Sequence, residues 1–220
     1  MKLKYYFQIS LLKTLIFNFR ILPLKDALKM PVILFRNTRI KSLEGDFRID
    51  PPLRHGMIKF GRCDVCGMEN SPTVISVKGT CRFKGKATIG SGSVLCVEKG
   101  GEFIAGKKLR ITGRSTIFCR NRISFGEDVL ISWDDLFMDS DHHDIFDRNG
   151  SLLNPAGEIA VGSHVWLGCR CTFLKGCSIK DGSVVASGSI LNRDFPETDA
   201  VIGGSGSGQR ILRFGVRWQE

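Results

Sequence analysis

The stretch VGSHVWLGCRCTFLKGCSIKDGSVVASGSIL, residues 161–191, repeats with a period of six. The first position of each hexapeptide is apolar, and it is held by Val161, Leu167, Phe173, Ile179, Val185 and Leu191. The fifth position is small or short, and it is held by Val165, Cys171, Cys177, Ser183 and Ser189. This period fits neither an α-helix nor a single strand, but it is typical of parallel β-helices. The stretch therefore predicts an all-β solenoid, with one hexapeptide on each face of a triangular coil and the first-position side chain in its core.

The six-residue repeat also occurs nearer the N-terminus, and its limits indicate how the chain is organised. It runs through residues 77–95, slips near Gly100-Gly101 and resumes over 111–137. We expect about six coils of 18 residues between residues 77 and 193. The predicted organisation is a helical arm or cap at 1–42, a β-helix at 43–195 with a protruding loop at 138–160, and a short tail at 196–220.

Positive charge is concentrated in the arm. The net charge is +10, and residues 1–42 contain nine Lys or Arg against the single acid Asp26. The body is therefore nearly neutral, which argues against nucleic-acid binding. Polar residues interrupt the apolar segment 5–24, so we expect amphipathic rather than membrane-spanning helices, with a break at Pro23. These helices should cover the open end of the solenoid, and their basic surface could rest on an anionic membrane.

The eight cysteines are interpreted as thiols of a cytoplasmic protein, because the sequence has no cleavable secretory signal. Cys81, Cys171 and Cys177 occupy the small inward position of the repeat, where a thiol acts as a small apolar group. Cys63 and Cys66 form a C-x-x-C pair without a second pair at zinc-finger spacing. No metal is expected.

The rhythm stops after Phe137 and restarts at Val161. The intervening segment is polar and contains His142 and His143, two of the four histidines. A loop projecting from a regular solenoid is a common place for binding or catalytic groups.

The hexapeptide run, the histidine loop and the basic tail together resemble the hexapeptide-repeat O-acetyltransferases. The pattern is similar to the maltose and galactoside acetyltransferases, and more so to enzymes that acetylate bacterial capsule or O-antigen sugars. The resemblance implies a left-handed parallel β-helix, a homotrimer, acetyl-CoA as the donor and active sites between subunits. It covers about residues 55–215.

Acetyl transfer to a sugar hydroxyl needs a base, and histidine suits this role because its ordinary pKa is near neutrality. The motif Asp139-Ser-Asp141-His142-His143-Asp-Ile resembles the D-x-D-x-H pattern of the surface-polysaccharide relatives and indicates His143. His142 is the alternative, because it keeps the spacing to Trp166 found in the simpler sugar acetyltransferases. Asp141, or else Asp139, would orient the ring. No serine or cysteine lies in a nucleophile elbow, so we expect direct transfer in a ternary complex.

The resemblance also implies a donor site along the coil edges. Its residues would be Trp166, Gly168, Cys169, Ser187 and the basic residue Arg193, with Arg213 from the tail meeting the phosphates of the cofactor. Cys169 and Ser187 are one coil apart and should stack on one edge. The family's proline-containing turn after the last coil is replaced here by a glycine- and serine-rich run at 203–208.

The sequence therefore predicts an acetyl-CoA-dependent O-acetyltransferase, cytoplasmic or peripheral on the inner membrane, acting on a sugar of a bacterial surface polysaccharide or its precursor. Two alternatives remain open: an N- or O-acyltransferase of a small sugar or amino sugar, and a non-catalytic trimeric scaffold. A zinc hydratase on the same fold would need three well-placed histidines, which the sequence lacks.

Overall fold

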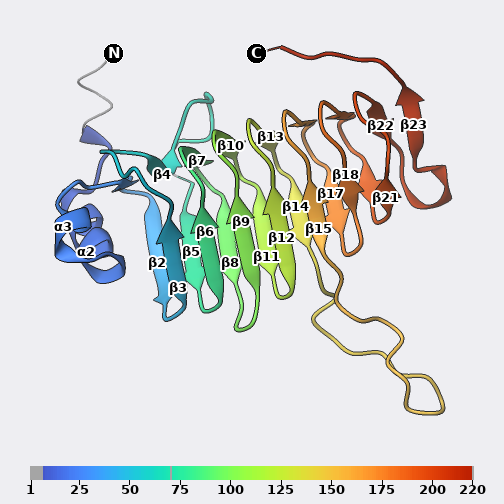
Figure 1. Cartoon of the computed structure of the whole chain (residues 1–220), viewed down its shortest axis with the longest axis horizontal. Helices are drawn as coiled ribbons and strands as arrows, with labels where there is room; N and C mark the ends of the chain where they lie inside the picture. The colour runs from blue at the N-terminus through green and yellow to red at the C-terminus, as the bar shows by residue number, and fades with distance from the viewer. Residues whose placement is uncertain (1–6, 70, 220) are drawn as a thin grey trace.

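The computed structural model is a column of parallel strands with two helices at one end and a long loop projecting from its side (Figure 1). It describes residues 7–69 and 71–219. The first six residues of the expected arm lie outside this range. The predicted all-β parallel β-helix with a small helical cap is confirmed.

Three sheets form the three faces of the column, and the chain visits them in turn. The first sheet contains β1 (Val32–Leu34), β4 (Ile58–Arg62), β7 (Ala87–Gly90), β10 (Leu109–Gly113), β13 (Leu130–Trp133), β16 (Trp166–Leu167), β19 (Val184–Val185), β22 (Val201–Gly203) and β23 (Arg210–Arg213). The second sheet contains β2 (Thr38–Leu43), β5 (Thr73–Val77), β8 (Val94–Val97), β11 (Thr116–Cys119), β14 (Leu136–Met138), β17 (Thr172–Leu174) and β20 (Ile190–Leu191). The third sheet contains β3 (Asp46–Ile49), β6 (Thr80–Phe83), β9 (Glu102–Ala105), β12 (Arg122–Phe125), β15 (Ile159–Val161), β18 (Ser178–Ile179) and β21 (Asp194–Phe195).

The coils differ in length, so the expectation of uniform 18-residue coils is wrong for the N-terminal half. Strand pairing advances by 18 residues from Trp166 to Val184. It advances by 20 residues from Arg110 to Leu130 and by 22 residues from Ala87 to Leu109. The extra residues lie between strands, as at Gly100-Gly101 between β8 and β9, where the rhythm of the sequence slips. Longer corners of this kind leave the inward and outward alternation within each strand unchanged.

The core is a stack of aromatic rings along the axis. Neighbouring ring centroids lie 4.6–6.3 Å apart, in the range of favourable aromatic contacts, and the stack comprises Phe17, Phe47, Phe60, Phe83, Phe103, Phe125, Phe137 and Phe173. Cys81, Cys171 and Cys177 are buried with free thiols, as the small inward position predicts. Burial raises the pKa of the Cys171 thiol to about 11, so this thiol packs as an apolar group.

Two helices, α2 (Leu11–Ile21) and α3 (Leu24–Ala27), close the N-terminal end on either side of Pro23. β1 and β2 already form part of the first coil at residues 32–43. The β-helix therefore begins about ten residues before the predicted boundary at residue 42. The hydrophobic residues Val32, Ile33 and Leu34 supply this early strand, which lacks the six-residue rhythm.

The C-terminal end is closed by a hairpin. β22 continues the first sheet beyond the predicted end at residue 195, and β23 pairs antiparallel with it. The glycine- and serine-rich run forms the connection, which includes a short 3₁₀ turn, η1 (Gly206–Gly208). Buried Gln209 fixes the connection, because its side chain donates a 2.7 Å hydrogen bond to Asn192 and accepts one from the Asn192 backbone N–H at 3.0 Å. The run is therefore an ordered turn that covers an exposed sheet edge.

Candidate functional site

The histidine loop leaves the column between β14 and β15, at residues 139–158, which agrees closely with the predicted 138–160. It projects from the corner where the chain passes from the second to the third sheet (Figure 1), and we call this the loop corner. Asp139 anchors its base: the buried carboxylate accepts hydrogen bonds of 2.8 Å from the backbone N–H groups of Arg120 and Asn121. The Asp139 carbonyl accepts a third bond from the N–H of Gly157 at 3.0 Å. Both ends of the loop are thus tied to the solenoid.

The His142 ring is held against the preceding coils. Its Nδ1 atom lies 3.5 Å from the Glu98 carboxylate, and its ring meets the Phe118 ring edge-on with centroids 5.8 Å apart. The His142 carbonyl accepts a hydrogen bond from the Arg120 guanidinium at 3.3 Å. His142 has a φ of 60°, a conformation uncommon outside glycine that costs about 1 kcal/mol or more. The chain therefore turns sharply between the two histidines.

His143 is exposed. Its backbone carbonyl accepts a 2.8 Å hydrogen bond from the Asn154 side chain. Among the described residues, no partner of the His143 imidazole is found. The ring can therefore meet a substrate or a neighbouring molecule.

Asp141 does not contact either histidine ring by a hydrogen bond in the described chain. Its carboxylate accepts hydrogen bonds from Lys175 at 2.6 Å and from Asn154 at 2.8 Å. These bonds, led by the one from Lys175, lower the pKa of Asp141 from its usual value. Lys175 also donates to the Asn154 carbonyl at 3.1 Å. Lys175, on the next coil, thus holds both ends of the loop through Asp141 and Asn154. We call these two hydrogen bonds the latch.

Sequence reasoning did not assign Glu98, Asn154 or Lys175 to the site. The pairing of the coils would have indicated two of them, Glu98 and Lys175. Val97 pairs with Cys119 and Met138 pairs with Leu174, so Glu98 and Lys175 each follow directly after a strand of the second sheet. Residues that follow aligned strands of a solenoid stack at one corner. Asn154 carries no comparable signal because it lies within the irregular loop.

A second group of residues, which includes the predicted Trp166, Gly168, Cys169 and Ser187, lies near the place where the chain passes from the first to the second sheet. We call this the tryptophan corner. Trp133 ends β13 and Trp166 begins β16. Trp166 Nε1 donates to the Ser132 hydroxyl at 3.1 Å. Both indoles are partly exposed and line a groove of about 330 Å³ together with Arg110, Thr112 and Ser132.

Cys169 and Ser187 stack at the tryptophan corner, one coil apart, as predicted. The thiol donates to the Ser187 hydroxyl at 3.6 Å. Gly168 has a structural reason to be glycine: a Cβ atom there would lie 2.7 Å from the backbone nitrogen of Ser187. Close packing of coils therefore requires this glycine independently of any ligand.

The two predicted arginines lie away from this edge. Arg193 follows β20 at the loop corner, where its guanidinium donates to the Gln209 carbonyl at 2.7 Å and stacks 4.7 Å over the Phe195 ring. Arg213 is exposed at the end of β23. The expectation that both join Cys169 and Ser187 in one groove has no support from these positions.

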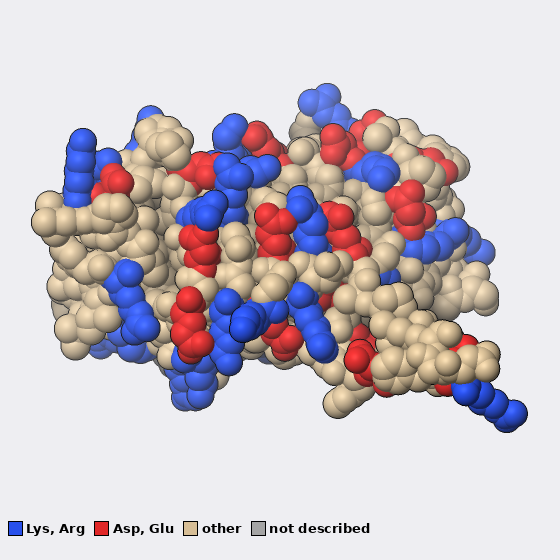
Figure 2. All heavy atoms as spheres, turned by 60° about the horizontal axis from the view of Figure 1, so that its bottom comes forward, with Lys and Arg blue, Asp and Glu red and all other residues tan. Residues whose placement is uncertain are grey.

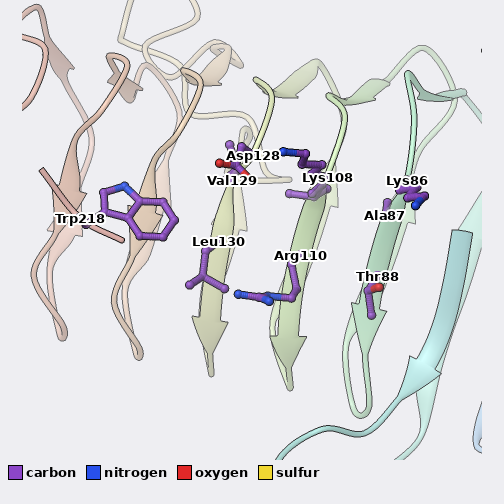
Figure 3. Close-up of a pocket in the computed structure, with 10 residues that line it drawn as sticks. Lys86, Ala87, Thr88, Lys108, Arg110, Asp128, Val129, Leu130 and Trp218 are labelled. Atoms are coloured by element: carbon purple, nitrogen blue, oxygen red, sulfur yellow. The ribbon is translucent and has the colours of Figure 1, made fainter. Parts of the chain in front are cut away.

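The tail adds a third tryptophan that sequence reasoning did not assign. Trp218 stacks on His164 with ring centroids 4.4 Å apart and donates from Nε1 to the His164 carbonyl at 2.8 Å. Asp128 binds His164 Nδ1 at 3.0 Å. Figure 3 shows Trp218 beside a groove of about 220 Å³ on the outer face of the first sheet, and Lys86, Lys108 and Arg110 also line this groove.

The histidine loop and the tryptophan corner lie at different corners of the coil, with the second sheet between them. In the part of the chain that the structure describes, no group of three or more His, Cys, Asp or Glu residues could hold a metal ion. Within the same residues, no helix is long and apolar enough to cross a membrane.

No protein-family model matches the chain. Comparison with characterised sequences gives acetyltransferases, in agreement with the resemblance drawn from the hexapeptide pattern. The chain is 29% identical over 112 residues to a polysialic acid O-acetyltransferase of Neisseria meningitidis, covering 50% of this chain and 42% of the relative. It is 30% identical over 122 residues to a polysialic acid O-acetyltransferase of Escherichia coli O1:K1 / APEC, covering 54% of this chain and 39% of that relative.

The matched region therefore spans about two fifths of the length of these relatives. Among solved structures, the polySia-specific acetyltransferase NeuO superposes with a TM-score of 0.47 at 22% identity, covering 83% of this chain and 82% of that chain.

Proposed function

We propose that this protein is an acetyl-CoA-dependent O-acetyltransferase that modifies a sugar hydroxyl of a bacterial surface polysaccharide or its precursor. The observation that carries the proposal is the match of half the chain to two polysialic acid O-acetyltransferases. The histidine loop, anchored at the one long break in the hexapeptide rhythm, supplies the chemistry. The loop is fixed at both ends, which favours a precisely held group over a mobile linker.

His143 acts as the general base in this proposal. The Glu98 carboxylate lies 3.5 Å from His142 Nδ1 and the Phe118 ring packs against His142, whereas His143 is more exposed and open to an acceptor. Its imidazole would take the hydroxyl proton as the sugar oxygen attacks the thioester carbonyl, and coenzyme A would leave as the thiol. Asp141 acts through the loop rather than on the ring, because Lys175 and Asn154 hold its carboxylate. We therefore assign Asp141 a positioning role.

The acetyl-CoA donor would lie along the tryptophan corner. Gly168, Cys169 and Ser187 form a narrow edge there because successive coils pack closely, and Trp166 offers an apolar surface beside it. Arg193 and Arg213 are less suited to hold the cofactor's phosphates. The Arg193 guanidinium is engaged by Gln209 and Phe195.

A complete site would need two copies of the chain, because His143 and the donor edge lie at different corners. A homotrimer would bring the loop of one copy to the tryptophan corner of the next. The tip of the loop has the surface for such a contact: Ile145, Phe146 and Leu153 are 55–60% exposed. Burial of these side chains against a neighbour would stabilise the assembly.

The expected place of action is the cytoplasm, where acyl-CoA is available, with the basic arm toward the anionic inner face of the membrane. The acceptor would be a saccharide of a polymer, a lipid-linked unit or a nucleotide sugar. An amino group on a small sugar could accept the acetyl group by the same chemistry.

Release of free thiol from acetyl-CoA tests the proposal. The wild type, His143→Ala and His142→Ala would be compared with polysialic acid, free sugars, amino sugars and nucleotide sugars as acceptors. We expect acceptor-dependent release that falls by about 10²–10⁴-fold only in His143→Ala. Loss only in His142→Ala would move the base by one residue. Release only with amino sugars would replace the O-acetyl proposal, and no release with any acceptor would favour the scaffold alternative.

A further inference from the structure

Helix α2 turns two polar side chains, those of Thr14 and Asn18, toward the protein. Thr14 and Asn18 are buried and face β1, the exposed edge of the first sheet. The Thr14 hydroxyl accepts from the Leu34 N–H at 3.0 Å. The Asn18 side chain accepts from the Val32 N–H at 3.1 Å and donates to the Val32 carbonyl at 2.7 Å. These two side chains replace the hydrogen bonds of a missing strand, which explains why polar residues face inward.

Most large apolar side chains of the cap consequently face outward. Only Phe17 of α2 enters the aromatic stack. Eight large apolar side chains are 44–74% exposed, and we call them the outer cap face: Phe7, Leu11, Leu12, Leu15, Ile16, Phe19, Leu24 and Leu28. Covering the end of the solenoid does not require these apolar side chains, because Thr14 and Asn18 already form hydrogen bonds with the backbone groups at the edge of β1. A concentration of exposed apolar side chains of this size indicates an interaction surface.

Cations accompany this surface. Arg20, Lys25 and Lys29 are exposed beside the apolar side chains. Within residues 7–42 the only acid is Asp26, and its carboxylate accepts a 2.8 Å hydrogen bond from Lys29. Figure 2 shows the same end of the molecule, at the left, as a mostly uncharged surface with blue side chains around it.

We infer that the outer cap face inserts into the interfacial region of an anionic lipid membrane, with the column standing away from it. Apolar side chains flanked by Lys and Arg match the two layers of such a membrane: acyl chains below and anionic headgroups above. A second copy of the chain fits less well, because pairing two outer cap faces would bring their cations together. With 11 residues, α2 is about 16 Å long, so it lies in the interface and does not span.

This inference deepens the proposed location at the membrane but does not depend on acetyl transfer. The site residues and the outer cap face lie in different parts of the column (Figure 1). Membrane binding and thiol release can therefore fail separately.

Co-sedimentation with vesicles tests the inference on the full chain. The vesicles would contain either phosphatidylcholine alone or phosphatidylcholine and phosphatidylglycerol in equal parts. We expect the wild type to sediment with the anionic vesicles at low salt. The triple variant Leu12→Ser, Leu15→Ser, Phe19→Ser should partition at least about tenfold less, because three inserted side chains are lost.

A matched control replaces an apolar side chain at the other end of the column. Phe214 is 65% exposed, and Phe214→Ser should leave vesicle binding unchanged. The charge variant Lys25→Glu, Lys29→Glu should bind anionic vesicles about tenfold less and lose part of its salt dependence. Thermal unfolding without vesicles checks that all variants are folded.

Two outcomes would overturn the inference. The first is a wild type that stays in the supernatant with both kinds of vesicle. If the triple variant then also elutes differently from the wild type in gel filtration, the face is a contact between copies of the chain. The second is equal vesicle binding by the wild type and the triple variant.

Discussion

The loop corner and the tryptophan corner differ in how the chain builds them. At the loop corner, polar side chains hold an insertion: Asp139 binds two backbone N–H groups, and Lys175 spans Asp141 and Asn154. At the tryptophan corner, unbroken coils approach so closely that Gly168 has no room for a Cβ atom. One corner depends on side-chain hydrogen bonds, and the other depends on backbone packing.

Because of this difference, we expect the loop corner to contribute mainly to the chemistry and the tryptophan corner mainly to the stability of the protein. The loop corner can change its side chains without altering the core, because its anchors lie outside the aromatic stack. At the tryptophan corner, Gly168 cannot gain a side chain without moving the coils themselves. We therefore expect substitutions at the loop corner to affect mainly turnover, and substitutions at Gly168 to affect mainly folding.

The largest expected effect comes from mixing two inactive variants. His143→Ala removes the proposed base, and Ser187→Trp fills the donor edge at an exposed position. If each site combines the two corners of different copies, the co-expressed mixture should regain about a quarter of wild-type thiol release, since one site in four is intact on random assembly. Each variant alone should be inactive. A mixture that stays inactive while the variants still assemble together would contradict the two-copy site.

A side chain at Gly168 should destabilise the protein. Gly168→Val places a bulky group against the backbone of Ser187, and we expect the free energy of unfolding to fall by about 1–3 kcal/mol. Urea unfolding followed by circular dichroism measures the change. Gly208→Ala is the control, because a Cβ atom there meets nothing within 4 Å. Equal stability of the wild type and Gly168→Val would show that the coils have more space than the structure indicates.

Loosening the latch should lower turnover by a smaller factor. Lys175→Met keeps much of the side-chain length but removes the hydrogen bonds to Asp141 and Asn154. We expect kcat to fall about tenfold with little change in KM for the donor, because the base is less well positioned. Lys180→Met is the control, since Lys180 pairs with Asp194 away from the loop. An unchanged kcat would leave the latch without a role in catalysis.

The smallest expected effect is a pH-dependent change in stability at Asp135, next to the tryptophan corner. Its side chain is buried, one carboxylate oxygen has no hydrogen-bond partner among the described residues, and burial raises its pKa to about 8. The folded state therefore holds the proton more tightly than the unfolded state. The stabilisation that the protonated Asp135 gives the folded state is fully present below about pH 4, and it is lost as the pH rises toward about 8.

Asp135→Asn should remove this dependence. The amide oxygen can still accept the hydrogen bond from the Cys171 N–H. We expect the variant to gain stability relative to the wild type as the pH rises from about 4 to about 8, and to be similar to the wild type near pH 4. Unfolding by urea at both pH values measures the difference. A constant difference across this range would show that Asp135 does not titrate as proposed.

The hexapeptide period predicted the parallel β-helix and the positions of the core side chains from Val161 onward, because inward and outward alternation is local. It also placed the loop, since a break in a repeat is visible without a structure. The longer N-terminal coils were missed because extra corner residues leave the strands unchanged. The start of the β-helix at Val32 was missed because β1 is a short apolar strand without the rhythm.

The sequence alone thus determined that inward apolar positions must stack into a solenoid and that a histidine-bearing loop must leave it. Only the tertiary structure decided which residues of different coils meet. Glu98 lies beside His142, 44 positions away in sequence, and Lys175 reaches Asp141, 34 positions away. Arg193 lies at a different corner from Cys169.

The tertiary structure also decided that α2 faces the sheet with Thr14 and Asn18. The physical reason is the same throughout: partners are set by the register between coils and by unsatisfied backbone groups at the edge of the sheet, which local sequence patterns do not specify.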